Sequence, residues 1–201
     1  MRAFLRTQLW PAIALLAILT LITGLVYPAA VTAVAQLAFP TQANGSFIVV
    51  DGKTVGSSLI GQYFDEPQYF WGRPSAAGAT PSNPGGYDPT SSGGSNLGPT
   101  SRRLIEEVVQ RVDALRKANG NAPIPADLVT ASASGLDPDI SPAAAAYQVP
   151  RVARARGMTV AAVQALVAKH TSGPMLGFLG AAHVNVLQLN LALDGLLQPG
   201  S

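Results

Sequence analysis

The fold is decided by residues 10–26, which read Trp-Pro-Ala-Ile-Ala-Leu-Leu-Ala-Ile-Leu-Thr-Leu-Ile-Thr-Gly-Leu-Val. They lie in a stretch from Thr7 to Val50 that contains no Asp, Glu, Lys or Arg. A bilayer core about 30 Å thick needs roughly 20 apolar residues in a helix, and a lone span must satisfy its backbone groups internally. We therefore predict one transmembrane helix over residues 10–38. Pro28 is expected to kink or end it near the outer end, because proline lacks an N–H.

The charges ahead of this stretch predict its orientation. Arg2 and Arg6 are the only charged side chains there, and positive charge is retained on the cytoplasmic side. Residues 1–9 are then cytoplasmic, and residues 39–201 lie outside the cytoplasm. The alternative is a cleaved signal peptide with Ala33-Val34-Ala35 as its cleavage site. Its apolar segment would be only about 7–15 residues long, so the length of the run favours a retained anchor.

Composition narrows the function of the outer portion. The chain has no Cys, which excludes disulfides and Cys-ligated metals. Of thirteen basic residues two precede the anchor, so eleven basic residues face eleven acidic ones and the formal charge of the outer portion is zero. A nucleic-acid partner would need a basic face, so none is predicted. The remaining length suits one domain.

Short strands are predicted first in the outer domain. Phe47–Val50 and Thr54–Val55 flank Asp51-Gly52-Lys53, and Asp-Gly is a strong hairpin signal because glycine accepts a positive φ. Leu59–Phe64 is expected to form a further strand. From Arg73 to Thr100 the chain is rich in Pro, Ser, Gly and Asn, which is typical of a long surface loop.

Helices are predicted next, so the domain is of the α+β class. Ser101 is a suitable N-cap for a helix that carries apolar residues on one face and stops at Asn119-Gly120. Ser141-Pro142 begins another helix, which Pro150 is expected to break or restart before a segment that ends at Gly157.

Thr159 is expected to cap a further helix that runs to about His170. The final segment, 184–194, fits either a strand by its alternation or a helix by its leucine spacing. Its Ala, Leu and Gln content favours the helix.

No catalytic or metal site is predicted from local motifs. Asp137 and Asp139 could act as a carboxylate pair, but beside Pro138 they more readily make side-chain turns with nearby N–H groups. His170 and His183 lack zinc-site spacing, and we expect one at a helix end and the other in a loop. A serine-hydrolase elbow at Ser95 would need glycine where Leu97 stands, and no phosphate-binding loop is present.

Six short motifs occur in the same order as in one known family: Leu59-Ile-Gly-Gln62, Arg73-Pro-Ser-Ala76, Ser92-Gly-Gly-Ser-Asn-Leu-Gly-Pro99, Ser134-Gly-Leu-Asp-Pro-Asp-Ile-Ser-Pro142, Gln148-Val-Pro-Arg-Val-Ala153 and Val184-Asn-Val-Leu-Gln-Leu-Asn190. With its N-terminal anchor, the chain resembles the C subunit of the bacterial Kdp high-affinity potassium-transporting ATPase over nearly its whole length. Ala181-Ala182-His183 departs from the family, where a more charged lead-in is usual.

The resemblance implies a single-pass, non-catalytic subunit of the bacterial inner membrane. In such complexes a channel-like subunit carries potassium selectivity, and a P-type ATPase subunit hydrolyses ATP with Mg²⁺. The C subunit is described as needed for assembly and as a chaperone that raises the ATP affinity of the pump subunit. These two subunits and the lipid bilayer are therefore the expected partners, and no tightly bound cofactor is expected on this chain.

The resemblance also suggests functional residues. Gln148 matches the family's proposed nucleotide contact, although nucleotide lies inside the cell and the domain is predicted to lie outside. We therefore expect any effect on ATP affinity to be indirect. Candidates for contact with partner subunits are polar residues of the motifs: Arg73, Ser75, Ser95, Asn96, Asp137, Asp139, Arg151, Asn185 and Asn190.

An alternative of a different class is a membrane-tethered extracytoplasmic enzyme or ligand-binding module of the cell envelope. Its site would lie in the loop of residues 73–100, together with Asp137 and Asp139. The residues assign it no reaction.

Overall fold

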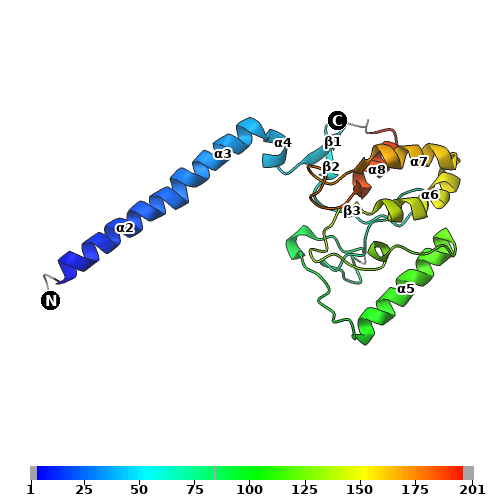
Figure 1. The fold of residues 1–201 in the computed structure, drawn as a ribbon, viewed down its shortest axis with the longest axis horizontal. Coiled ribbons are helices and arrows are strands. Elements are labelled where there is room, and N and C mark those ends of the chain that lie inside the picture. The colour runs from blue at the N-terminus through cyan, green and yellow to red at the C-terminus, as the bar shows by residue number, and fades with distance from the viewer. Residues whose placement is uncertain (1–3, 84, 197–201) are drawn as a thin grey trace. The chain divides into compact units, whose positions relative to one another are not determined.

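The computed structural model describes residues 4–83 and 85–196. The chain divides into two compact units, one ending at Phe47 and the other beginning at Ile48. Figure 1 shows the first as a long helix and the second as short strands, helices and loops. This confirms the predicted fold class.

The helix of the first unit runs from Leu5 to Ala38. It begins with the π-helical turn η1 (Leu5–Leu9), and its α-helical parts α2 (Trp10–Leu21) and α3 (Tyr27–Ala38) are joined by a second π-helical turn, η2 (Ile22–Val26). Its 34 residues span about 51 Å at 1.5 Å per residue, more than a hydrocarbon core. By length and composition this helix can cross a membrane.

Pro28 does not end the helix, contrary to one of the predicted outcomes. The π-helical turn η2 comes directly before it, and the Tyr27 N–H bonds the carbonyl of Ile22. A proline in a helix leaves the carbonyl four residues earlier without its donor, which here is Gly24. The π-helical turn surrounds that carbonyl, as is common where a helix accommodates an interruption. The helix then continues to Ala38, and the short helix α4 (Pro40–Ala43) follows.

The predicted hairpin is present in strands β1 (Phe47–Val50) and β2 (Lys53–Ser57), which form a two-stranded sheet. Asp51 and Gly52 both have positive φ, as a tight hairpin turn requires. The further strand expected at 59–64 is wrong, since this segment is irregular. The segment is fixed by isolated hydrogen bonds and not by a ladder of strand hydrogen bonds. The Gly61 N–H donates to the carbonyl of Leu136 at 2.9 Å, and the Gln62 side chain donates to the Val55 carbonyl at 2.8 Å.

A three-stranded antiparallel sheet forms from distant parts of the chain. Its order is β3 (Asp139–Ile140), β5 (His183–Asn185), β4 (Thr171–Ser172). Val184 in the central strand faces Ile140 on one side and Thr171 on the other. The prediction of a helix from residue 184 is therefore wrong for its first residues. The helix α8 (Val186–Leu193) begins only after Asn185, whose side chain caps it by accepting from the Gln188 N–H.

The remaining helices have the predicted caps. Helix α5 (Arg102–Asn119) begins with Ser101 as N-cap and ends at Gly120. Helix α6 (Pro142–Arg156) has Ser141 as N-cap and Gly157 in the left-handed conformation after its end. Thr159 caps α7 (Val160–Lys169), and His170 is its C-cap, as expected. Two 3-10 turns, η3 (Pro89–Ser91) and η4 (Ala126–Leu128), lie in the loops.

Pro150 does not interrupt α6, contrary to prediction. The helix is continuous from Pro142 to Arg156. The carbonyl that loses its donor belongs to Ala146, and both Ala146 and Pro150 are exposed. Water can therefore satisfy that carbonyl, and the proline ring occupies solvent rather than the core.

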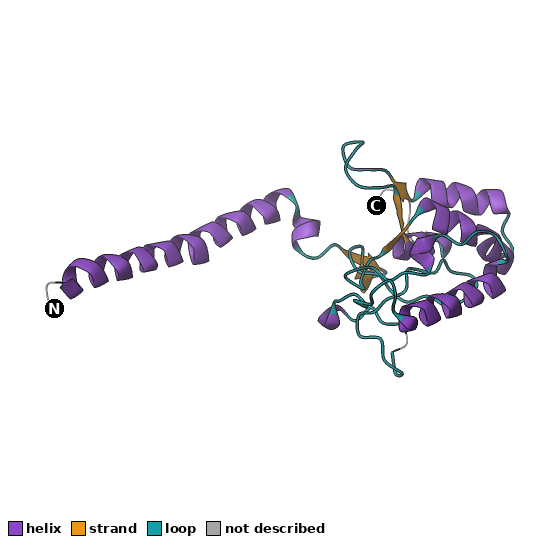
Figure 2. Cartoon of the chain, turned by 60° about the horizontal axis from the view of Figure 1, so that its bottom comes forward, coloured by secondary structure: helices purple, strands orange, loops and turns teal. Residues whose placement is uncertain are grey.

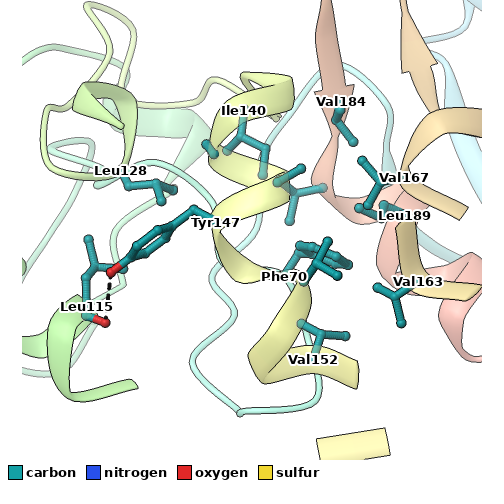
Figure 3. Packing of buried hydrophobic residues seen from close by; sticks show 14 of the residues in the cluster. Phe70, Leu115, Leu128, Ile140, Tyr147, Val152, Val163, Val167, Val184 and Leu189 are labelled. Atoms are coloured by element: carbon teal, nitrogen blue, oxygen red, sulfur yellow. Dashed lines mark hydrogen bonds between the residues drawn. The ribbon is translucent and has the colours of Figure 1, made fainter. Parts of the chain in front are cut away.

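The core of the second unit is centred on α6. This helix contacts α5, α7 and β5, while α8 contacts α7 and β5. Figure 3 shows side chains from these elements converging around Phe70, and the Tyr147 hydroxyl donates to the Leu115 carbonyl at 3.3 Å. Figure 2 shows that irregular segments make up much of the rest of the unit. Residues 73–83 and 85–100 are mainly such loop, as predicted.

Candidate functional site

Helix α6 presents two polar side chains to the core. Gln148 and Arg151 are three residues apart and therefore share one face of the helix. The exposed fraction is 0% for Gln148 and 5% for Arg151. Both groups must find partners within the protein, because an unpaired polar group in the interior is costly.

Gln148 finds its partners in the main chain of Trp71. Its Oε1 accepts from the Trp71 N–H at 2.8 Å, and its Nε2 donates to the Trp71 carbonyl at 3.1 Å. The same Nε2 also donates to the carbonyl of Ala144 at 3.3 Å. The carboxamide thus satisfies both backbone groups of Trp71, as a neighbouring strand would.

Asn190 in α8 does the same for the preceding residue. Its Oδ1 accepts from the Phe70 N–H at 2.8 Å, and its Nδ2 donates to the Phe70 carbonyl at 2.9 Å. Asn190 is 1% exposed and Phe70 is fully buried. Two amide side chains from different helices therefore hold consecutive residues of one irregular segment.

Arg151 completes this polar network. Its Nε donates to the Asn119 side chain at 2.9 Å, and one terminal nitrogen donates to the carbonyls of Pro67 and Tyr69 at 2.6 and 2.9 Å. The other donates to Gln148 Oε1 at 2.7 Å, and the guanidinium lies 4.0 Å from the Trp71 ring centroid. Burial lowers the pKa of Arg151 to about 10, so it remains charged at neutral pH. We call Gln148, Arg151, Asn190, Asn119 and Trp71 the amide–arginine network.

A second cluster holds the long loop. Arg73 forms an ion pair with Asp137 at 2.7 Å, both side chains being about one-quarter exposed. Ser75 Oγ donates to the carbonyl of Gly135 at 2.5 Å and accepts from the Tyr87 N–H at 2.8 Å. The Tyr87 hydroxyl donates to the Arg73 carbonyl at 2.7 Å, and burial raises its pKa to about 12. The start of the loop is thereby bound both to Tyr87 near its middle and to residues 135–137.

Asp137 and Asp139 adopt the structural role that their sequence predicts. Asp137 Oδ1 accepts from the Asp139 N–H at 3.0 Å, which is a side-chain turn. Asp139 accepts from the Asn185 side chain at 3.2 Å, and Asn185 also donates to the Ser58 carbonyl at 2.9 Å. The expectation that His183 lies in a loop is wrong, since it is in β5 with its Nε2 4.0 Å from the Asp139 carboxylate.

Residues 9–195 match the family model described as K+-transporting ATPase, c chain. The chain belongs to the KdpC family.

Curated relatives are similar over the same extent. The potassium-transporting ATPase KdpC subunit of Sorangium cellulosum is 60% identical over 190 residues, 94% of this chain and 97% of the relative. The corresponding subunit of Polaromonas naphthalenivorans is 59% identical over 194 residues, 96% of each chain. That of Herpetosiphon aurantiacus is 57% identical over 192 residues, 94% and 97% of the two chains. The similarity thus includes both the N-terminal helix and the α+β domain.

Seven of the predicted interface candidates lie in the two clusters. Arg151 and Asn190 belong to the amide–arginine network, where they bind the carbonyls of the consecutive residues Tyr69 and Phe70. The other five lie in or beside the second cluster: Arg73, Ser75, Asp137, Asp139 and Asn185. Ser95 and Asn96 are exposed and belong to neither group, and Asn96 has a positive φ of 52°.

Three residues of these clusters had not been singled out from the sequence. Trp71 and Tyr87 are aromatic residues inside Gly- and Pro-rich surroundings, and such isolated large side chains are a signal of burial. For Asn119 the sequence pattern indicates only the end of a helix. Its side chain binds Arg151, which no local pattern indicates.

Two cavities border the second cluster. One of about 380 Å³ is lined by residues that include Gln62, Trp71, Arg73, Tyr87 and Arg111. Another, of about 680 Å³ and more open, also includes Arg73, with Asp137 and residues 131–134. Arg73 Nε is buried and lacks a hydrogen-bond partner within the described chain. Arg73 therefore retains a donor that these parts of the protein do not use.

Proposed function

We propose that this chain is a non-catalytic, membrane-anchored subunit that stabilises a channel-like subunit and a P-type ATPase subunit in a potassium import complex. The observation that carries the proposal is the family match over residues 9–195, which includes the anchor as well as the domain. The curated relatives bear the name of a subunit of a potassium-transporting ATPase. The other Kdp subunits are then its partners.

The anchor suits packing against other helices in the bilayer. Small residues allow close approach of helix backbones in membranes, where no hydrophobic force drives association. Those spread along it include Ala12, Ala14, Ala17, Gly24, Ala29, Ala30 and Ala33. We propose that this helix ties the two large subunits together, with its N-terminus in the cytoplasm as Arg2 and Arg6 predict.

The domain would then lie outside the cytoplasm of a bacterial inner membrane, over the external face of the channel-like subunit and near potassium entry. A role as scaffold is supported by the way its buried polar side chains are used. Gln148, Arg151 and Asn190 all bind groups of the chain itself. Among residues 4–83 and 85–196, no group of three or more His, Cys, Asp or Glu side chains could hold a metal ion.

The proposed rise in the ATP affinity of the pump subunit is indirect. ATP and Mg²⁺ are used on the cytoplasmic side, so an external domain can influence them only by favouring one conformation of the complex over another. A nucleotide contact at Gln148 stays a prediction. The side chain is 0% exposed and its carboxamide is bound to Trp71 and Arg151, so such a contact would require the amide–arginine network to open.

The test is purification of the tagged full chain from native membranes in mild detergent, followed by identification of the co-purified proteins and an assay of potassium-stimulated ATP hydrolysis. We expect a stoichiometric complex with a channel-like subunit and a P-type ATPase. A variant that lacks residues 41–201 but retains the anchor should lose transport and complex recovery. Unchanged transport and recovery would contradict the proposal.

A further inference from the structure

Among the large apolar side chains that the structure describes in the second unit, the most exposed lie in the connection between β4 and β5. Met175 is 70% exposed, Leu176 78% and Phe178 74%, and Leu179 is 49% exposed. We call residues 173–180 the apolar hairpin. A contiguous group of large exposed apolar residues marks an interaction site more often than it occurs by chance on a soluble surface.

The apolar hairpin is a preformed structure. Met175 and Leu179 form an isolated antiparallel bridge, in which each N–H donates to the other's carbonyl at 2.9 Å. The Phe178 N–H also donates to the Met175 carbonyl at 3.3 Å, and the Gly177 N–H to the Pro174 carbonyl at 3.0 Å. Four N–H groups of the hairpin are therefore paired locally, which lowers the cost of burying it against a partner.

The tip also contains a strained residue. Leu176 has a φ of 55°, a conformation that suits Gly or Asn and is an outlier for a bulky side chain. No buried neighbourhood forces it, because the side chain projects into solvent. A large apolar residue at this position costs stability in the isolated domain, so it is better explained by what it binds than by what it packs against.

The surroundings of the hairpin favour a protein partner over a lipid surface. Segments that bind bilayers carry Lys and Arg for anionic headgroups and Trp or Tyr at the headgroup level. From His170 to Leu193 the chain contains no Asp, Glu, Lys, Arg, Trp or Tyr. The apolar hairpin therefore resembles the aromatic and aliphatic anchor residues that fill pockets in protein interfaces.

We propose that the apolar hairpin inserts Leu176 and Phe178 into an uncharged apolar pocket on the external face of the channel-like Kdp subunit. The proposal rests on the proposed function, because family membership supplies the partner subunits and the predicted orientation places the domain outside. It goes further by naming the element that docks and the chemistry of the pocket that receives it.

A fluorescence experiment tests the docking in the intact chain. The protein has no Cys, so Phe178→Cys places a single thiol in this chain for an environment-sensitive nitrobenzoxadiazole label. Emission is compared for the labelled chain alone in nanodiscs of phosphatidylethanolamine and phosphatidylglycerol and for the assembled complex. Complexes that contain the unsubstituted chain give the background from other subunits. Val109→Cys, on α5 and 52% exposed, is the matched control.

We expect a blue shift at position 178 only in the complex and none at position 109. If the emission wavelength at position 178 in the complex remains that of a label in a polar environment, the proposal is overturned. A blue shift in nanodiscs that each hold one chain would identify lipid as the occupant, and one that depends on chain concentration in detergent would identify a second copy. Either result also overturns it.

A recovery experiment separates this inference from the proposed function. The pair Leu176→Asn and Phe178→Ser keeps a residue that tolerates positive φ at the turn, and should lower the recovery of the other subunits about tenfold or more. The control pair Ile105→Gln and Val109→Gln should leave recovery unchanged. If the unsubstituted chain recovers its partners and the hairpin pair does so equally, this inference fails alone. If the unsubstituted chain recovers none, the proposed function fails.

Discussion

Gln148 and Trp71 are 77 residues apart in the sequence, and one carboxamide binds both the N–H and the carbonyl of Trp71. Asn190 binds Phe70 in the same way across 120 residues. An irregular segment is therefore held at the core by side chains instead of a strand. The stability of this region therefore depends on a few amide groups.

Gln148→Ala should lower the free energy of unfolding by about 2–3 kcal/mol, because it leaves the Trp71 backbone groups and an Arg151 donor unpaired in the interior. Thermal unfolding of the full chain in detergent measures the change. Gln164→Ala, at an exposed position of α7, should change stability by less than about 0.5 kcal/mol. If the stability is unaltered but the complex binds ATP more weakly, the result would instead favour a direct nucleotide contact at Gln148.

Arg151→Lys should cost about 2–4 kcal/mol of stability. A lysine keeps the charge but cannot reach Asn119, Gln148 and two backbone carbonyls at once, as the planar guanidinium does. Unfolding in urea provides the measurement. Arg154→Lys, exposed and one turn further along the same helix, is the control and should be within about 0.5 kcal/mol of the unsubstituted chain. Equal stability of the two variants would show that the network contributes little.

Gly135→Ala should destabilise the long loop by at least about 2 kcal/mol. Gly135 has a φ of +66°, and a Cβ there would lie 2.6 Å from the Gly93 carbonyl oxygen and 2.7 Å from the Ala77 nitrogen. Limited proteolysis should cut residues 73–100 faster in this variant. Gly98→Ala, which has open space and no positive φ, should leave the cleavage rate unchanged. Similar rates in both variants would argue against the attachment described for this loop.

Asp139→Asn should alter the pH dependence of stability. Burial raises the pKa of the Asp139 carboxyl, Asp137 adds to the effect, and His183 and Asn185 oppose it. The folded chain therefore binds this proton more tightly than the unfolded chain, and stability falls as pH rises from the unfolded pKa of about 3.9 towards the higher folded pKa. The Asp139→Asn variant has no carboxyl at this position, so it does not show this decrease in stability with rising pH.

The stability of Asp139→Asn relative to the unsubstituted chain should therefore increase between about pH 4 and pH 7, as measured by thermal unfolding in detergent. His183→Gln, examined alone and combined with Asp139→Asn, removes the imidazole whose Nε2 lies 4.0 Å from the Asp139 carboxylate. A difference that stays constant over this range, or decreases, would contradict the assignment.

The sequence by itself determined the features that depend on neighbouring residues. The uncharged run from Thr7 to Val50 is long enough to predict the N-terminal helix without any tertiary contact. Ser101, Ser141 and Thr159 cap the helices they were expected to cap, because each hydroxyl bonds an N–H only three residues away. The turn at Asp51-Gly52 likewise needs only local freedom of φ.

Tertiary structure decided the features whose partners lie far away. Residues 59–64 have a strand-like composition, but no strand pairs with them. Val184 and Asn185 are a strand because Asp139–Ile140 and Thr171–Ser172 flank them, and α6 continues through Pro150 because that side faces solvent. The partners of Gln148, Arg151 and Asn190 were beyond local prediction for the same reason: a buried amide is stabilised by groups that only the folded chain brings within hydrogen-bond distance.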